Sequence, residues 1–280
     1  MHPLMTIAVR AARRAGEVIA RAVPRLEDLK VEAKSRNDYV SEVDRAAEHE
    51  IVEIIHQAYP AHAILAEEGG ASGEHEARWI IDPLDGTTNY LHGFPVFAVS
   101  IACEVRGRLE VAVVYDVMRQ ELFTATRGAG AQLDNRRIRV GKRRGLEGTL
   151  VSTGFPFRTE GELETYMAML QAVIPKVGDV RRPGAASLDL AYVAAGRVDA
   201  HWEMSLAPWD TAAGALLVTE AGGHVSRVDG SPYEHGGSIC AGNPRVHAAL
   251  IACLAPLVTA PPRGVKSGGT LRARARKEPS

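Results

Sequence analysis

Residues 79–90, WIIDPLDGTTNY, place two carboxylates directly after a short apolar run. The apolar side chains favour a buried strand, so we expect Asp82 at the end of that strand, where loops of α/β proteins carry function. A tight turn at the glycine after Asp85 would bring the Leu84 carbonyl and the Thr87 hydroxyl toward the same point. This cluster of hard oxygen ligands suits Mg²⁺ or Mn²⁺ better than zinc, which prefers sulfur and imidazole.

Two further segments also end in acids. Apolar residues 64–66 lead into Glu67 and Glu68, and Asp210 opens an apolar helix that is predicted for residues 209–221. Each acid has a simpler explanation on its own, because Asp-Pro and Asp-Gly-Thr are common turn sequences and Asp210 would suit a helix N-terminus. Acids at three element ends, taken together, favour a metal site.

These segments together resemble the inositol monophosphatase family, whose members are Mg²⁺-dependent, lithium-sensitive phosphatases. The first family signature is similar to residues 79–89, the second to residues 209–223, and the family's glutamate motif to residues 66–68. Residues 184–199 are most similar to the bacterial inositol-1-monophosphatase branch, and the resemblance spans residues 3–255. It implies hydrolysis of a phosphate monoester by a metal-bound water, without a covalent intermediate.

The resemblance also implies a ligand set for two or three Mg²⁺ ions in each active site, with Mn²⁺ as an alternative. Glu67, Asp82 and the Leu84 carbonyl would bind the first ion. Asp82, Asp85 and Asp210 would bind the second ion, so that Asp82 bridges the two. A third and weaker ion would be held mainly by Glu67 and water.

Two residues are expected to act on the attacking water, again by resemblance: Thr87 would orient it and Asp44 would accept its proton. Asp44 also fits a purely structural role, because Ser41 and Asp44 have the spacing of a capping box at the start of a helix. The sequence leaves both roles open. Lys34 resembles a family lysine that lies near the waters of the metal site.

The predicted substrate contacts come from both halves of the chain. They are Asp85, Gly86, Thr87, Thr88, Arg181, Gly184, Ala185, Ala186 and Glu203. Backbone N–H groups at Gly86 and Thr88 would bind the phosphate, and residues 184–186 would let the backbone approach the substrate closely. By resemblance, Glu203 would contact sugar hydroxyls with Arg181 as its ion-pair neighbour, whereas its position after a strand is equally typical of an exposed acid.

Hydrophobic periodicity predicts the elements that must carry these residues. Helices are expected over residues 3–22, 41–58, 162–173, 186–195, 209–221 and 244–254. Strands are expected over residues 96–103, 109–115 and 122–126, as a meander of hairpins, and over residues 149–153, 198–202, 223–228 and 238–241. The resemblance implies an α/β (α+β) fold, a layered α/β/α/β/α sandwich of the inositol monophosphatase and fructose-1,6-bisphosphatase type. Residues 1–258 would form one phosphatase domain of two joined α/β halves that meet near residues 140–150.

Composition excludes several other classes of protein. With 46% hydrophobic and 24% charged residues, the 280-residue chain can bury a sizeable core without disulfides. Its three cysteines lack a C-x-x-C spacing and its ten histidines lack zinc-site spacings, so neither a redox motif nor a zinc site is expected. No apolar run is long enough to cross a membrane. We therefore expect a cytoplasmic enzyme without a membrane partner.

The C-terminal segment, residues 259–280, is called the basic tail below. Residues 261–280 hold six basic groups and one acid, a net charge of +5 that leaves −6 on the rest of a chain whose total is −1. Because the tail is rich in Pro, Gly and Ser and has no apolar periodicity, it is predicted to be disordered. It could contact RNA or a transcription complex electrostatically, or be a solvated terminus without a partner.

The first functional hypothesis is hydrolysis of myo-inositol-1-phosphate, with a homodimer expected from the resemblance. Fructose 1,6-bisphosphate, histidinol phosphate and phosphoadenosine phosphate are alternative substrates, because the same metal core serves several phosphate monoesters. A second hypothesis, from a different class, is a binding role in an RNA or transcription assembly. The basic tail is the feature that supports it.

Overall fold

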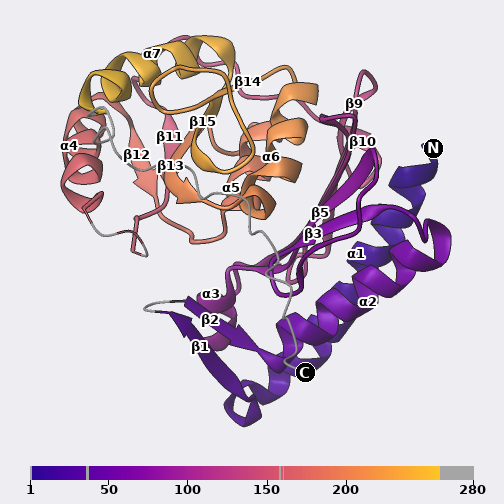
Figure 1. Ribbon diagram of the computed structural model, residues 1–280. Coiled ribbons are helices and arrows are strands. Elements are labelled where there is room, and N and C mark those ends of the chain that lie inside the picture. Colours follow the sequence, from indigo (N-terminus) through magenta and orange to yellow (C-terminus); the bar gives the residue numbers. More distant parts are fainter. Residues whose placement is uncertain (1, 36–37, 158, 160, 259–280) are drawn as a thin grey trace, which may run out of the picture.

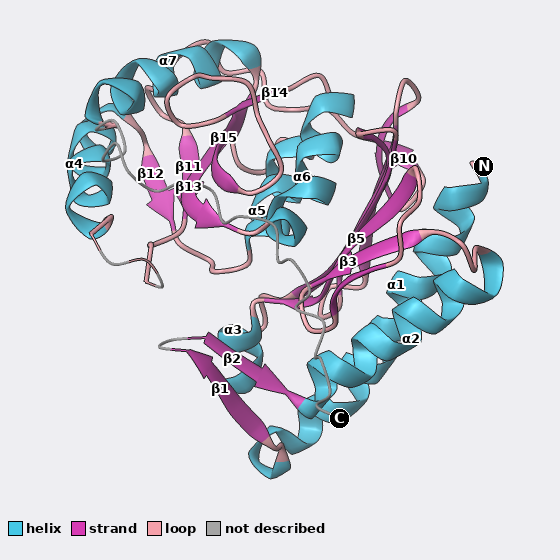
Figure 2. Ribbon diagram, in the orientation of Figure 1, coloured by secondary structure: helices cyan, strands magenta, loops and turns pink. Residues whose placement is uncertain are grey.

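Two β-sheets alternate with three pairs of helices in five layers (Figures 1 and 2). The computed structural model describes residues 2–35, 38–157, 159 and 161–258. Helices α1 (Pro3–Ala22) and α2 (Glu42–Ala58) cover the outer face of the first sheet, α5 (Ala186–Ala194) and α6 (Pro208–Glu220) lie between the sheets, and α4 (Leu163–Val173) and α7 (Pro244–Leu254) cover the outer face of the second. This arrangement confirms the predicted α/β/α/β/α sandwich. The basic tail lies outside the described residues.

The first sheet has eight strands in the order β10-β9-β8-β7-β6-β5-β3-β4. Their bounds are β3 (Ala63–Ala66), β4 (Gly70–Ser72), β5 (Ala77–Asp85), β6 (Ala98–Val105), β7 (Arg108–Asp116), β8 (Glu121–Thr126), β9 (Gly130–Leu133) and β10 (Arg136–Arg137). Neighbouring strands are antiparallel except for β3 and β5. Strands β6, β7 and β8 confirm the predicted meander. Its first turn has left-handed backbone at Arg106 (φ 53°) and Gly107 (φ 73°), as a two-residue hairpin loop requires.

The second sheet has five strands in the order β12-β11-β13-β15-β14. Their bounds are β11 (Leu150–Thr153), β12 (Asp179–Arg181), β13 (Ala200–Leu206), β14 (His224–Ser226) and β15 (Gly237–Gly242). Strand β11 is parallel to both β12 and β13, whereas β15 is antiparallel to β13 and β14. The four predicted strands of this half are present, and the three-residue edge strand β12 is an addition to the prediction.

Several short elements were not predicted. They are strands β4, β9 and β10, the hairpin of β1 (Val31–Ser35) and β2 (Asp38–Ser41), helix α3 (Thr87–Leu91), and the 3₁₀ helices Val23–Asp28, Ile174–Lys176 and Ala255–Leu257. Strand β1 is exposed over its first residues, so it lacks the alternation of buried and exposed side chains that marks a strand in sequence. Helix α3 has five residues, which is too few for a helical period to show.

Three hydrophobic clusters fill the space between the layers. The first lies between α1, α2 and the first sheet, the second lies between the two sheets, and the third lies beneath α4 and α7. Trp79 and Trp202 are fully buried in the first and third clusters, and the three cysteines are free and buried. In the part of the chain that the structure describes, we find no helix with the length and apolar character needed to span a membrane.

Helices α5 and α6 approach each other so closely that Gly214 has no room for a side chain, because a β-carbon there would overlap Leu190. Gly214→Ala should therefore lower the free energy of unfolding by about 1–3 kcal/mol through overpacking. Gly145→Ala is the matched control, since a β-carbon at Gly145 meets no heavy atom within 4 Å. Denaturant unfolding of both variants tests the prediction, and equal stability of the two would contradict it.

Candidate active site

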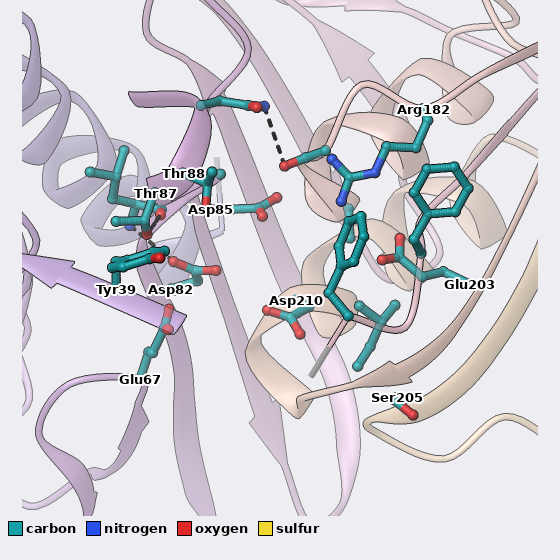
Figure 3. Close-up of a pocket in the computed structure, with 18 of the residues that line it drawn as sticks. Tyr39, Glu67, Asp82, Asp85, Thr87, Thr88, Arg182, Glu203, Ser205 and Asp210 are labelled. Atoms are coloured by element: carbon teal, nitrogen blue, oxygen red, sulfur yellow. Dashed lines mark hydrogen bonds between the residues drawn. The ribbon is translucent and has the colours of Figure 1, made fainter. Parts of the chain in front are cut away.

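A cavity of about 590 Å³ lies where the end of β5, α3, the end of β13 and the start of α6 meet. Five acidic side chains line it: Glu67, Asp82, Asp85, Glu203 and Asp210. Figure 3 shows Glu203 and Arg182 across the cavity from Asp82 and Thr87. The Leu84 residue also lines the cavity, so the structure brings all five predicted metal ligands to one place.

Strand β5 continues through Asp85, further than the sequence indicated, and its pairing with β6 becomes irregular between Asp82 and Asp85. Pro83 lacks a backbone N–H group and cannot continue the ladder. The N–H group of Leu84 donates to Asp82 Oδ1 at 2.9 Å. An irregularity of this kind re-aims side chains, and here it allows both aspartates to line the same cavity.

Helices α5 and α6 hold two of the aspartates through their first turns. Asp85 Oδ2 accepts hydrogen bonds from the backbone N–H group of Ser187 at 2.8 Å and from its hydroxyl at 2.6 Å. Asp210 Oδ2 accepts one from the backbone N–H group of Ala207 at 2.6 Å, so Asp210 also caps α6. Ser187 was not predicted, because it lies 102 residues from Asp85 along the chain and no local pattern links them.

Burial and the charges of neighbouring acids oppose the ionisation of the three aspartates. Burial raises the pKa of Asp82 well above its usual range, and the negative charges of Glu67, Asp85 and Asp210 raise it further. The pKa of Asp210 is raised strongly by burial and by the charges of Asp85 and Glu67. Burial raises the pKa of Asp85 to about 6, although the hydrogen bonds from Ser187 lower it. A bound cation would relieve this uncompensated negative charge.

The donor set fits a hard divalent cation by its chemistry. Each aspartate uses a single oxygen for the hydrogen bonds described above: Oδ1 of Asp82, Oδ2 of Asp85 and Oδ2 of Asp210. Glu67 and Leu84 line the same cavity, and Mg²⁺ prefers carboxylate and carbonyl oxygens. Over the described ranges, no group of three or more acidic, histidine or cysteine side chains is arranged to hold a metal ion. The fit therefore rests on the donor types and their shared cavity.

Thr87 connects the cavity to Asp44 of α2. Its hydroxyl oxygen lies 3.1 Å from Asp44 Oδ1 and 3.1 Å from the Leu84 carbonyl oxygen, and its single hydrogen can be donated to only one of them at a time. Asp44 Oδ2 accepts the backbone N–H group of Ser41 at 2.9 Å and the Ser41 hydroxyl at 2.5 Å. The predicted capping box is thus confirmed, and the same carboxylate also contacts Thr87. Burial raises the pKa of Asp44, which favours proton uptake.

Glu48 was not predicted, yet it holds the loop that carries Glu67. Its carboxylate accepts the backbone N–H groups of Glu68 at 2.9 Å and Gly69 at 2.7 Å. Glu48 follows Asp44 by about one turn of α2, so the two acids lie on the same helix face. This face supports both acid-bearing loops of the first half, and the four-residue spacing of the two acids is the signal that could have revealed it.

The substrate side of the cavity corrects the prediction for one arginine. Glu203 lines the cavity as expected, but Arg181 pairs with Asp179 at 2.5 Å on the edge strand β12 instead of with Glu203. Arg182 lines the cavity, and its guanidinium lies over two phenylalanine rings, 5.5 and 5.1 Å from their centres. Successive residues of an extended chain point to opposite sides, which explains why the neighbouring arginine takes this place.

Residues 184–186, which were predicted to approach the substrate, pack closely against Gly86. Gly86 has a φ angle of 90°, and a β-carbon there would lie 2.9 Å from the Val96 carbonyl oxygen and 3.3 Å from the Ala185 side chain. Only glycine accommodates both the left-handed backbone and this proximity. The turn after Asp85 therefore packs directly on the segment that begins α5.

The remaining predicted residues divide into those that line the cavity and those that do not. Gly86, Thr87, Thr88, Gly184 and Ala186 line it. Ala185 is fully buried and does not belong to the lining. The side chain of Lys34 lies outside what the structure describes. A further contact joins the halves at the cavity, because the Asn89 amide donates to the carbonyl oxygens of Val96 at 2.8 Å and Pro183 at 2.9 Å.

Comparison with known proteins gives a consistent family assignment. A family model described as the inositol monophosphatase family matches residues 1–259. The Nus factor SuhB of Pseudomonas aeruginosa is 55% identical over 263 residues, which cover 91% of this chain and 97% of that protein.

Two solved structures are similar in fold as well as sequence. The extragenic suppressor protein suhB from Bartonella henselae has a TM-score of 0.87 and 44% identity, covering 90% of this chain and 98% of its own. The inositol monophosphatase from Anabaena (Nostoc) sp. PCC 7120 has a TM-score of 0.80 and 38% identity, covering 93% of this chain and 97% of its own.

The raised pKa of Asp85 makes the stability of the metal-free protein depend on pH. A carboxyl whose folded pKa of about 6 exceeds its ordinary 3.8 stabilises the fold at low pH and loses that contribution as pH rises through the folded value. In Asp85→Asn, the fall in unfolding free energy between pH 5 and pH 7.5 should be smaller by about 1–2 kcal/mol. Denaturant unfolding at both pH values, in the presence of a chelator, measures this difference.

The control for this titration is Asp134→Asn, at a turn position with φ of 46° outside the cavity. Asparagine tolerates such a backbone, and this variant should retain the full decline of the unmodified protein. An undiminished decline in Asp85→Asn would contradict the assignment of the titration to Asp85.

Proposed function

The chain belongs to the inositol monophosphatase family, and we propose that it hydrolyses a phosphate monoester in a Mg²⁺-dependent, lithium-sensitive reaction, with myo-inositol-1-phosphate as the first candidate substrate. The observation that carries the proposal is the cavity itself. Acids that suit Mg²⁺ lie on one side, Glu203 lies on the other, and the Thr87–Asp44 pair adjoins both the acids and the space between.

The acidic side of the cavity would receive the phosphate. Glu67, Asp82, Asp85, Asp210 and the Leu84 carbonyl would hold two or three Mg²⁺ ions, or Mn²⁺ in their place. When bound, these ions supply positive charge to the phosphate and lower the pKa of a coordinated water. Without them, a dianionic phosphate would be repelled by the like charges of these acids.

Proton transfer is assigned to Thr87 and Asp44. If the Thr87 hydroxyl donates its hydrogen to Asp44 Oδ1, its oxygen is free to accept a hydrogen bond from the attacking water. The water is then oriented by Thr87, and its proton can pass through the hydroxyl to the buried carboxylate. The raised pKa of Asp44 suits a general base, because catalysis is most efficient when that pKa lies near the working pH.

The opposite side of the cavity would bind the rest of the substrate. Glu203 offers a carboxylate that accepts hydrogen bonds from hydroxyl groups of the leaving alcohol. Arg182, which rests over Phe155 and Phe157, places a positive charge near the mouth and favours an anionic ester. The small residues Gly184 and Ala186 leave room for a ring, and the backbone N–H groups of Gly86 and Thr88 are proposed phosphate contacts.

A second candidate function is favoured by the names of relatives such as the Nus factor SuhB of Pseudomonas aeruginosa. We propose that the protein contacts RNA or a transcription complex through the basic tail. Both functions can coexist, because the phosphate chemistry uses residues before the tail. A homodimer also remains a proposal.

The direct test is phosphate release from myo-inositol-1-phosphate, fructose 1,6-bisphosphate, histidinol phosphate and phosphoadenosine phosphate, with and without Mg²⁺ and with lithium. We expect Mg²⁺-dependent, lithium-inhibited release, fastest from myo-inositol-1-phosphate. Asp44→Asn should lower kcat by about 10²–10⁴-fold, the usual contribution of a general base. Faster release from another ester would change the substrate and keep the mechanism, whereas no release from any ester would refute the enzymatic proposal.

The matched control is Asn243→Ala, which removes another helix cap. Asn243 Oδ1 accepts the backbone N–H groups of Arg245 at 3.0 Å and Val246 at 3.1 Å at the start of α7, away from the cavity. This variant should lose about 1 kcal/mol of stability and keep its kcat within about twofold. An equal loss of turnover in both variants would mean that Asp44 acts only through the helix cap.

Removal of residues 259–280 separates the two candidate functions. Phosphate release should be unchanged, because the proposed catalytic, metal-binding and substrate-binding residues among the described cavity lining all precede the tail. Binding to RNA should weaken and become less sensitive to salt, since six basic groups are lost. Filter binding across a salt series measures this, and unchanged RNA affinity would exclude the tail as the contact.

A further inference from the structure

A group of buried polar side chains lies behind Glu203, and the reaction proposed above does not use it. It consists of His201 on β13, Ser152 on the neighbouring strand β11 and Asp189 on α5, all of which are at most 1% exposed. Ser152 Oγ lies 2.9 Å from His201 Nδ1, and His201 Nε2 lies 3.4 Å from Glu203 Oε2. The imidazole therefore has a hydroxyl on one side and a carboxylate on the other.

The two neighbours of the imidazole decide where its hydrogen must be. A serine hydroxyl can donate or accept, whereas a carboxylate can only accept. His201 Nε2 must therefore carry a hydrogen, because an unprotonated Nε2 would place a lone pair against the negative charge of Glu203. If Nδ1 is protonated as well, it can donate to Ser152, which frees the serine hydroxyl for Asp189.

Two buried polar atoms without a hydrogen-bond partner support this placement of the hydrogen on His201. Within the described residues, His201 Nε2 and Asp189 Oδ1 are buried atoms that lack a hydrogen-bond partner at normal distance. A buried polar atom without a partner is costly, and Glu203 Oε2 is an acceptor that lies 3.4 Å from Nε2. A small shift of the Glu203 carboxylate toward His201 would complete the bond.

The surrounding charges also favour a protonated imidazole. Burial alone lowers the pKa of His201, but the contact with Glu203 and the negative charges of Asp189 and Asp85 outweigh it and raise that pKa above its ordinary value of 6.5. These acids lie on β13, α5 and β5. Burial raises the pKa of Asp189 to about 7, while the charge of His201 and a hydrogen bond from Ser152 oppose that rise.

Glu203 is confined from the other side by the backbone of Gly154. A β-carbon at Gly154 would overlap the Glu203 carboxylate, so the carboxylate lies directly against the chain that follows β11. The Glu203 side chain keeps 14% of its surface exposed and lines the cavity (Figure 3). His201 and Gly154 thus hold it between them, with its remaining surface available to a ligand.

We propose that His201 is a positioning residue, which donates from Nε2 to Glu203 and fixes that carboxylate for recognition of hydroxyl groups on the substrate's leaving alcohol. Ser152 and Asp189 hold the imidazole from behind. This inference rests on the proposed function, since it assigns the polyol-recognising part of the same cavity. It also predicts selectivity: esters whose leaving group bears hydroxyls depend on His201, and esters without them do not.

The positioning should depend on pH in a defined direction. Because the pKa of His201 is raised, its positive charge persists to higher pH than that of an ordinary histidine and is lost as the pH rises through the folded value. KM for a polyol phosphate should therefore increase over that range. Asp85, Asp189 and Glu203 face His201, and Tyr166 and Arg182 also influence this group of charges. Only the part of the pH dependence of KM that disappears in a His201 variant is therefore attributed to His201.

The experiment compares two substrates at saturating Mg²⁺: myo-inositol-1-phosphate and phenyl phosphate, whose leaving group carries no further hydroxyl. His201→Phe should raise KM for the inositol ester by about tenfold, the loss expected for one charge-assisted hydrogen bond, with kcat reduced much less. Its effect on phenyl phosphate should stay below about threefold. His201→Gln, which keeps an N–H donor but does not titrate, should recover part of the affinity and remove the pH-dependent rise of KM.

The matched control is His247→Phe. His247 is also a buried histidine of the second half, 2.8 Å from a serine hydroxyl, Ser226 Oγ, but it does not line the cavity. This variant should lose stability in the same way without changing the ratio of KM values for the two esters. Gly154→Ala is an independent test, because displacement of Glu203 from the other side should reproduce the selective rise in KM.

A direct titration keeps the inference separate from the proposed function. The NMR resonances of His201 can be assigned because they are lost in His201→Gln. Their pH titration should give a pKa above 6.5, and this pKa should fall in Glu203→Gln. A His201 pKa that does not change in Glu203→Gln, or equal effects of His201→Phe on both esters, would overturn the positioning role. Failure of the unmodified protein to hydrolyse the inositol ester while it hydrolyses phenyl phosphate would instead refute the proposed substrate.

Discussion

The structure depends on one constraint, which is that four negative side chains must be held close together in a partly buried cavity. Like charges repel and burial penalises the three aspartates, as the raised pKa values of Asp82, Asp85 and Asp210 express. Hydrogen-bond donors close to the aspartates offset part of this cost. They are the backbone of the β5 turn, the first turn of α5 and the residue before α6. A bound cation would offset the remainder, and these backbone donors would keep the acids in place before it arrives.

Helix α2 shows how the same constraint shapes elements at some distance from the cavity. Its first turns carry Asp44, which joins the helix cap to Thr87, and Glu48, which accepts two backbone N–H groups of the loop beside Glu67. A carboxylate that caps its own helix and also contacts a proposed water-orienting threonine serves stability and chemistry together. Substitutions on this helix face should therefore be judged by turnover and stability measured side by side.

The five-layer arrangement brings acids from both halves of the chain to one cavity. The acids before residue 90 come from the first half, and Glu203 and Arg182 come from the second, with α5 and α6 packed between the sheets (Figure 1). The relatives carry both kinds of name, a Nus factor and an inositol monophosphatase. Asp210 on α6 and Ser187 on α5 belong to the second half, so the surfaces that can vary without disturbing the proposed metal ligands are the outer ones.

The sequence by itself determined the longer elements and the acids, because periodicity and capping patterns are local. Helix α1, the capping box of α2 and the acids at strand and helix ends could all be read directly. Only the tertiary structure decided which residues meet. Ser187 reaches Asp85 across 102 residues, His201 stands between Ser152 and Glu203, and Arg182 rather than Arg181 lines the cavity. Such contacts depend on strand register and on which side of an extended chain each residue faces, and no local pattern carries that information.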